Sequence, residues 1–344
     1  MKRCHYIVSV AVICLCCACR KGETPVQPQQ DSPAMSFSTS VSPTRSISTD
    51  NDNLKKHSIG IYGEYSQVEG GSGTSVFGTS NVTELKYGTN PSVSWYYEPL
   101  QYWKRNQYYR FRAYHPYDVA ENFETGDGAD NLVVYYRITP GSVGTWENYD
   151  LLVAFATRDT GGSAPFEPVR LKFNHALSAL RFNVTYAKEN NYDDLQDFWI
   201  EGLRVYGIMS YTHPAETTLG EVIKWDAQYF YDDKQFFLYN SGKRFTHAAP
   251  ANVYKNGDDS QGLIFVIPQS ISQPREDGSG TDWTTVCFKT AKSGDAVNRV
   301  NLPAVTWEPG KIYTYDLKLS TSEIIIDVTS KDWEVVESNI DIRL

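Results

Sequence analysis

The sequence lacks any stretch of about twelve residues in which apolar side chains recur with the 3.6-residue period of an amphipathic helix. Methionine is also scarce, with three residues, whereas tyrosine (24), phenylalanine (15) and tryptophan (8) are plentiful. Runs rich in β-branched and aromatic residues alternate with turn-forming Gly, Asn, Asp and Ser. This composition argues against a helical bundle and predicts an all-β protein.

Cysteine pairs are missing from most of the chain. Five of the six cysteines lie within the first 19 residues: Cys4, Cys14, Cys16, Cys17 and Cys19. Two C-x-x-C spacings among them would suit a redox or zinc site, but they fall in an apolar run that follows Lys2-Arg3, which is typical of a secretory signal. We therefore expect no internal disulfide downstream, and Cys287 is expected to be a small buried hydrophobe in a strand.

Positive charge is also in deficit, since the formal net charge is −9. An acidic chain without a basic patch argues against nucleic acid as a partner. The sequence contains no G-x-S-x-G nucleophile elbow, no P-loop, no G-x-G-x-x-G fingerprint and no H-E-x-x-H pair. These absences leave no motif for serine hydrolysis, nucleotide binding or zinc proteolysis.

The remaining candidate reactive groups are scattered. The histidines beyond the signal are far apart in the sequence: His57, His115, His175, His213 and His247. We interpret His175, which follows a strand, as a local hydrogen-bonding residue at a corner. Asp232-Asp233 and Asp258-Asp259 are interpreted as turn acids, because a calcium site needs more oxygen ligands at closer spacing. We expect no enzyme, no cofactor and no metal, although a spatial pair of carboxylates for glycoside cleavage stays open.

The N-terminus predicts export and lipid attachment. Residues 1–18 combine a basic start, a short apolar core and small residues, as a signal peptide does, and the core is too short for a permanent membrane helix. Ala18-Cys19 resembles the end of a bacterial lipobox, so Cys19 is predicted to be acylated; an ordinary secreted protein cut near Ala18 is the alternative. Residues 19–33 are polar and proline-containing, and we expect a linker.

Residues 149–186 contain the clearest strand pattern. Val169, Leu171 and Phe173 share one face because they alternate with basic residues. After a bend that is too short for a stable helix, a second apolar face is formed by Leu180, Phe182, Val184 and Tyr186. We expect two strands folded around a corner, which complete the first domain.

Aromatic residues crowd between residues 93 and 117. Trp95, Tyr97 and Trp103 could form an exposed platform for sugar rings. The alternative is strand packing, because Tyr109 and Phe111 belong to an alternating segment in which Arg110, Arg112 and Tyr114 would face the other way.

The chain is long enough for two domains. A polar stretch near residues 190–194 predicts the boundary, giving domains at residues 34–190 and 191–344. The apolar run at residues 262–269 is expected to be buried on both faces at the centre of the second core, which includes Leu263, Phe265 and Ile267.

Several segments, in order along the chain, resemble the fimbrillin family, the lipoprotein subunits of surface fimbriae in Bacteroides-type bacteria. They are Y-W at 102–103 with Y-x-F-x-A-Y-x-P at 109–116, D-L-L-V-A at 150–154, V-x-L-x-F-x-H-A-L-x-x-L-x-F-x-V at 169–184, I-P-Q at 267–269, and W-E-P-G-K-I-Y-T-Y at 307–315. The resemblance covers nearly all of the chain beyond the signal. It implies two antiparallel, transthyretin-like β-sandwich domains in tandem.

The resemblance also implies a mode of assembly. The precursor would be lipidated, moved to the outer membrane and cut by an arginine-specific protease, which would remove a segment that includes the first strand. The vacated groove would then accept a strand from another subunit. In this chain Arg45 is the expected cleavage site, and the expected donor strand alternates Ile340, Ile342 and Leu344 with polar residues.

The implied function is a structural or accessory subunit of a fimbrium, with a role in adhesion. Its partners would be other fimbrial subunits, the outer membrane through the lipid anchor, and a host or bacterial surface receptor. Two other classes stay open: a cell-surface glycan-binding lipoprotein that does not polymerise, and a secreted hydrolase in which two carboxylates or a His–acid pair converge in a cleft.

Overall fold

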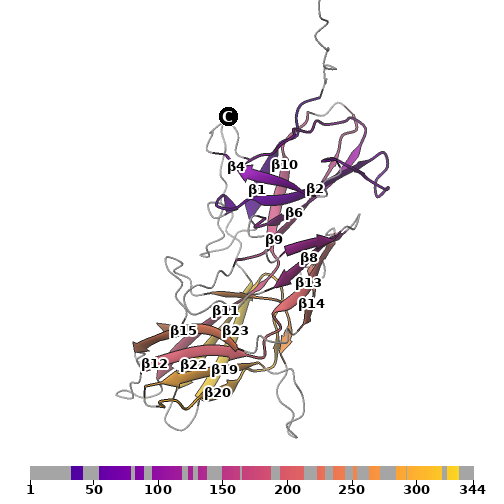
Figure 1. Ribbon diagram of the computed structural model, residues 1–344. Helices are drawn as coiled ribbons and strands as arrows, with labels where there is room; N and C mark the ends of the chain where they lie inside the picture. Colours follow the sequence, from indigo (N-terminus) through magenta and orange to yellow (C-terminus); the bar gives the residue numbers. More distant parts are fainter. Residues whose placement is uncertain are drawn as a thin grey trace, which may run out of the picture.

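The protein is all-β, as the composition predicts. In the computed structural model, all elements of regular structure among the described residues are β-strands. Together they form an elongated molecule (Figure 1). The structure describes residues 32–41, 54–78, 82–88, 95–117, 123–126, 131–137, 149–162, 165–186, 194–212, 223–228, 235–244, 251–253, 263–271, 284–291, 293–319 and 324–332. Within these ranges no helix is long and apolar enough to cross a membrane.

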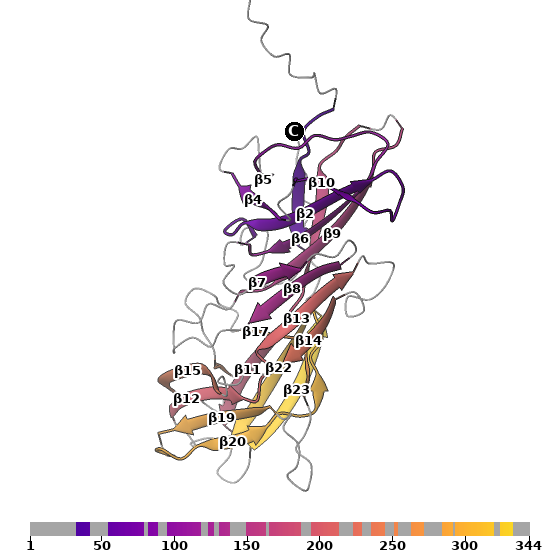
Figure 2. The ribbon, with the colours of Figure 1, turned by 45° about the vertical axis from the view of Figure 1, so that its right-hand side comes forward.

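One end of the molecule is an eight-stranded sheet (Figure 2). Its strands, in spatial order, are β1 (Phe37–Val41), β10 (Val169–His175), β9 (Leu152–Asp159), β6 (Tyr108–His115), β2 (Ile59–Ser66), β4 (Thr83–Tyr87) and β5 (Trp95–Tyr96), with β3 (Thr74–Ser75) paired to β2. Most neighbours are antiparallel, but β1 runs parallel to β10.

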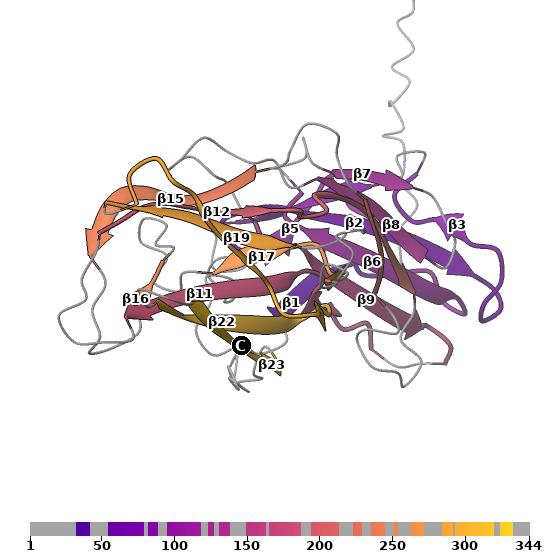
Figure 3. The same ribbon diagram turned by 90° about the horizontal axis from the view of Figure 1, so that it is seen from below.

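The other end contains two further sheets, seen from below in Figure 3. The first consists of β16 (Ala251–Asn252), β11 (Ser178–Tyr186), β22 (Lys311–Leu319) and β23 (Ile324–Asp332), with β17 (Ile264–Val266) also paired to β11. The second consists of β15 (Gln235–Arg244), β12 (Asp194–Glu201), β19 (Thr285–Thr290) and β20 (Asn298–Asn301). The long parallel pairing of β11 with β22 forms the centre of the sheet that contains β16, β11, β22 and β23.

A fourth sheet lies between these groups and joins distant parts of the sequence. Its order is β14 (Ile223–Gln228), β13 (Tyr206–Thr212), β8 (Asn131–Arg137) and β7 (Phe123–Gly126). The antiparallel pairing of β8 with β13 therefore crosses the predicted boundary at residue 190. A short ribbon of β18 (Ser270–Ile271) and β21 (Val305–Thr306) completes the described pairing.

The corner after His175 is where the chain changes sheet. β10 pairs with β1 and β9, whereas β11, which begins at Ser178, pairs with β16, β17 and β22. Alternate burial along both strands confirms the predicted apolar faces. The predicted two strands and corner are present, although the strands serve different sheets; the domain boundary at residue 190 stays a prediction.

The described residues form two hydrophobic clusters, one on the eight-stranded sheet around Phe111 and Phe173, and one around Phe182 and Tyr315. The predicted core residues of both ends are buried: Leu171, Phe173, Leu180, Phe182, Leu263, Phe265 and Ile267. Cys287 is buried in β19, as expected, and burial raises the pKa of its thiol to about 12.

The prediction for β6 was only half right. Tyr109 and Phe111 face the first cluster, but Arg112 and Tyr114, on the other face, are buried too. Tyr114 belongs to the second cluster, and the Arg112 guanidinium lies over the Tyr62 ring. The alternation could not reveal this burial, because the covering residues come from other parts of the chain.

Candidate functional site

The candidate site is the groove that holds residues 33–41. β1 is the end strand of the eight-stranded sheet and pairs along its length with β10, from Phe37 opposite Val169 to Val41 opposite Phe173. The Val169 amide donates to the Ser36 carbonyl at 2.8 Å. An edge strand has backbone N–H and C=O groups along its outer side that no neighbouring strand pairs, and a loop can cover them.

The loop of residues 95–103 closes over that other side. The Met35 amide donates to the Gln101 carbonyl at 2.8 Å, and the Trp103 amide donates to the Pro33 carbonyl at 3.2 Å. Ala34 forms an antiparallel bridge with Tyr102. The N-terminal end of the segment is therefore bonded along its backbone to this loop, while β1 itself is bonded to β10.

Two aromatic side chains of this loop region reach the segment directly. The Trp95 indole N–H donates to Thr39 Oγ1 at 2.9 Å, and the Tyr97 hydroxyl donates to the Met35 carbonyl at 3.2 Å. Burial raises the pKa of the Tyr97 phenol, so the hydroxyl keeps its proton and can donate. These bonds bring β5 and its flank close to β1, although the two strands stand at opposite ends of the sheet order.

Phe37 fixes the segment in the core. Its ring meets Tyr97 and Phe111 edge to face, with centroids 5.6 and 5.5 Å away. Phe37 and Met35 are 5% and 4% exposed, whereas Ser40 faces solvent. Burying each of the two apolar side chains contributes about 1.5–3 kcal/mol, so the segment is held by side chains as well as by backbone bonds.

The predicted processing and donor residues lie outside the described residues. This applies to Cys19, Arg45, Ile340, Ile342 and Leu344. The strand expected at 35–41 is confirmed as Phe37–Val41, and it ends shortly before Arg45. The aromatic loop that covers it was not predicted as its partner; the crowding of aromatics was the available signal, but a sequence does not say what such residues pack against.

The aromatic platform is not available to a ligand. Trp95, Tyr97 and Trp103 are 6%, 4% and 3% exposed, and Trp103 stacks on Phe166 at 5.6 Å. Strand packing is therefore the correct interpretation of these three residues. They do not form the exposed aromatic row that the sugar-binding alternative requires.

A histidine–carboxylate pair lies at the corner between β10 and β11. His175 Nδ1 contacts Asp150 Oδ2, so His175 does form a hydrogen bond at the corner, but with a partner 25 residues away in the sequence and not with a local one. Both side chains are buried, so a substrate cannot reach the pair in this conformation. In the part of the chain that the structure describes, no group of three or more His, Cys, Asp or Glu side chains could hold a metal ion.

His115 and His175 occupy the same register position on the two strands that flank β9, because each stands opposite Leu152. Burial, together with the nearby His57 ring, lowers the pKa of His115 to about 3. Its imidazole is therefore neutral at physiological pH, which suits a structural role in the interior.

Comparison with solved structures supports the fold. A crystal structure of a fimbrial protein from Bacteroides vulgatus ATCC 8482 superposes with a TM-score of 0.57 at 13% identity, covering 88% of this chain and 99% of the other. A proposed cell adhesion protein from Bacteroides ovatus ATCC 8483 gives a TM-score of 0.50 at 15% identity, covering 89% and 99%. At such identities the likeness is one of fold.

Sequence comparison identifies the family. No curated protein sequence matches the chain. A family profile described as fimbrillin-like, however, matches residues 44–333, which is most of the chain. The fimbrillin resemblance noted from the motifs is thereby confirmed, and the chain belongs to the fimbrillin-like family.

Proposed function

We propose that this protein is a fimbrial subunit that assembles by β-strand exchange. The observation that carries the proposal is the position of residues 33–41, which include the edge strand β1 and yet insert Met35 and Phe37 into the core. If this segment left, the sheet edge of β10 and the loop of residues 95–103 would border an apolar groove. A strand from another subunit could then pair with the edge and fill the same pockets.

The sequence of the segment suits displacement. β1 has five residues, Phe-Ser-Thr-Ser-Val, and Ser40 is exposed. A short strand rich in Ser and Thr buries less apolar surface than a strand of alternating aliphatic residues. An incoming strand with more apolar alternate positions would therefore bind the groove more tightly.

Processing after Arg45 would release the segment. Arg45 is the single basic residue between Lys21 and Lys55, and it stands in a polar Pro-Thr-Arg-Ser-Ile stretch. Such stretches are preferred sites of proteolysis. The alternative is that residues 43–45 are only a loop and that β1 stays paired.

The remaining parts of the proposal concern architecture and place. We infer that the sheets form two transthyretin-like sandwiches in tandem, at residues 34–190 and 191–344. Cys19 would carry the lipid that anchors the precursor to the outer membrane, where other subunits and a surface receptor would be its partners. The protein would act in adhesion as a structural element and not as an enzyme.

Proteolysis of the full-length precursor tests the scheme. We expect an arginine-specific protease to create a new N-terminus at Ser46 and to produce ladders on a gel that survive mild detergent. The Arg45→Lys variant should remain monomeric under the same treatment, since it keeps the charge but removes the cleavage residue. Ladders formed equally by that variant would disprove Arg45 as the processing site, and a cut at Ser46 without any polymer would disprove strand exchange.

A further inference from the structure

The second face of the eight-stranded sheet carries polar rows of side chains that the groove does not use. Residues directly opposite one another on neighbouring strands share a face of the sheet. Across β2, β6 and β9 the first row is Ser66, Tyr108 and Asp159, and the second is Glu64, Arg110 and Thr157. The groove residues pack instead against Phe111, on the opposite face of β6.

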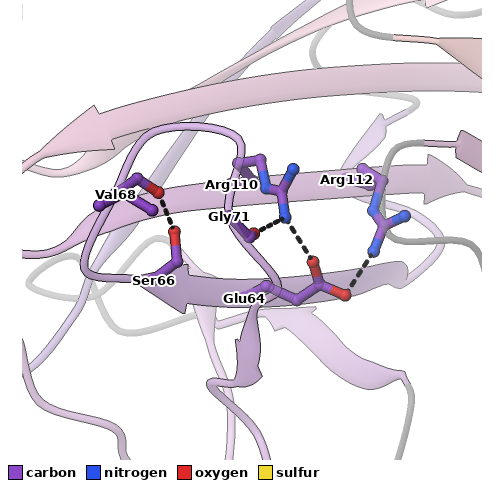
Figure 4. Close-up of polar contacts among 6 residues, drawn as sticks. All are labelled: Glu64, Ser66, Val68, Gly71, Arg110 and Arg112. Carbon is purple, nitrogen blue, oxygen red and sulfur yellow. Dashed lines mark hydrogen bonds and ion pairs between the residues drawn. The ribbon is translucent and has the colours of Figure 1, made fainter.

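The turn after β2 is fastened over these rows (Figure 4). Arg110 Nη2 donates to the Gly71 carbonyl at 3.0 Å and lies 3.3 Å from Glu64 Oε2. Within the turn, the Ser66 hydroxyl and the Gly71 amide both donate to the Val68 carbonyl, at 2.6 and 3.1 Å. Hydrogen bonds within the protein therefore hold the turn against the sheet.

A cavity of about 460 Å³ lies between this turn and the sheet. Its size falls within the range of small-molecule sites. Strand β6 supplies Tyr108, strand β9 supplies Phe155, Thr157 and Asp159, and the turn supplies Glu69. The lining therefore combines aromatic rings with hydroxyl and carboxylate groups, so the cavity offers both apolar and hydrogen-bonding contacts.

The charge in the cavity selects among ligands. Glu69 and Asp159 are exposed carboxylates, whereas Arg110 is paired with Glu64. Arg158 also borders the cavity, but its guanidinium donates to the Pro165 carbonyl and lies over the Trp103 ring, on the other face of the sheet. The exposed charges of the lining are therefore those of Glu69 and Asp159, and their negative sign disfavours an anionic ligand.

We propose that this cavity binds a neutral sugar, one or two residues long. The half-buried Tyr108 ring, which lines the cavity, can stack on the apolar C–H face of a pyranose. The carboxylates of Glu69 and Asp159 can accept hydrogen bonds from adjacent sugar hydroxyls, and Thr157 can donate or accept. The site is separate from the groove, so it does not depend on strand exchange.

Saturation-transfer NMR on the full-length, uncleaved protein tests the site. The probes are glucose, galactose, mannose, fucose, N-acetylglucosamine and lactose, with N-acetylneuraminic acid as the acidic comparison. We expect at least one neutral sugar to receive saturation at millimolar concentration and the acidic sugar to receive none. The absence of saturation in every neutral sugar, or equal saturation of the acidic one, would overturn the proposal.

Matched variants locate the binding. The double variant Glu69→Gln/Asp159→Asn keeps the side-chain shapes at two exposed positions, so it should fold. We expect it to bind the neutral sugar that receives saturation roughly tenfold more weakly than the wild type does. Glu98→Gln, an exposed carboxylate outside the cavity, should bind as the wild type does. Tyr108→Ala should also weaken binding. Unchanged affinity in the double variant would contradict this site.

Discussion

The ring of Phe37 meets the ring of Phe111 edge to face, with centroids 5.5 Å apart and an angle of 82° between their planes. Phe111 lies on β6, which is separated from β1 by β9 and β10 in the sheet order. The N-terminal segment is thus an edge strand by its backbone but a core element by its side chain. Any strand that replaces it must supply an apolar residue at this position to restore the core.

The Phe37→Ala variant should be strongly destabilised. Removing a buried phenyl ring leaves a cavity beside Phe111 and Tyr97, and such substitutions cost about 3–5 kcal/mol. Urea unfolding of the uncleaved protein measures the loss. Ser40→Ala, on the same strand but exposed, should change the free energy of unfolding by less than about 0.5 kcal/mol. A similar, small effect of both variants would mean that Phe37 does not hold the segment in place.

The Phe182→Ala variant should be equally costly at the other end of the molecule. Phe182 is fully buried, stacks on Tyr315 with centroids 5.1 Å apart and also contacts Phe198. We expect a loss of about 3–5 kcal/mol in the free energy of unfolding. Thr185→Ala, which lies on the partly exposed face of the same strand, is the control. A loss below about 1 kcal/mol for Phe182→Ala would contradict the packing of the second cluster.

The local patterns were predictable from the sequence, whereas the long-range pairings were not. The alternation from Val169 to Phe173 and from Leu180 to Tyr186 predicted which residues are buried, because the buried face of a strand carries apolar residues at every second position of that same strand. The parallel pairing of β1 with β10, and of β11 with β22, joins residues more than a hundred positions apart. No local pattern specifies which edges meet.

In the candidate site, too, the local strand was predictable from the sequence and its long-range contacts were not. The strand at residues 35–41 was predictable from Phe37, Thr39 and Val41, but its cover by Trp95 and Tyr97 was not. Those aromatics were correctly interpreted as packing residues, yet packing alone does not name the segment they pack against. The sugar-sized cavity was missed for the same reason, because its residues come from three strands and a turn.

Acid should destabilise the protein through His115. The pKa of its buried imidazole is lowered from 6.5 to about 3, so the unfolded chain takes up a proton that the folded chain refuses. The stabilising effect of keeping His115 neutral is complete above pH 6.5 and is lost as the pH falls toward 3, by about 1.4 kcal/mol per pH unit. Urea unfolding at pH 7.5, 5.5 and 4.5 measures this slope.

The His115→Leu variant separates this effect from other acid-sensitive groups. It replaces the imidazole by an apolar side chain of similar size that cannot take up a proton, so its stability should fall less steeply between pH 6.5 and 4.5 than that of the wild type. His57, whose ring lies 6.0 Å from that of His115, is left unchanged in both proteins. Identical slopes in the two proteins would exclude His115 as the source of the acid sensitivity.

Cys19 should be the site of lipid attachment. It follows the signal core and Ala18, and the polar residues 20–33 would form a tether between lipid and fold. Metabolic labelling with palmitate should mark the wild type and not Cys19→Ala. Cys17→Ala is a matched control that should remain labelled. Equal labelling of wild type and Cys19→Ala would assign the lipid to another residue, and the absence of label from the wild type would leave ordinary secretion as the better explanation.

The C-terminal tail should act as the donor strand. Ile340, Ile342 and Leu344 alternate with Asp341 and Arg343, so three apolar side chains share one face of an extended segment. The groove buries Met35 and Phe37 at alternate positions, and that pattern is the complement of such a face. Eleven residues follow Trp333, so the tail has a short reach, and its length is part of the test.

Deletion of residues 339–344 should therefore abolish polymer formation after protease treatment while leaving cleavage itself intact. Ile342→Asp should have the same effect, because a carboxylate cannot be buried in an apolar pocket without a large cost. Asp341→Asn, on the opposite face of the strand, should still polymerise. Mixing the deletion variant with cleaved wild type should cap the ladders, since its groove accepts a strand but it can donate none. Ladders of normal length from the deletion variant alone would assign the donor strand to another part of the chain.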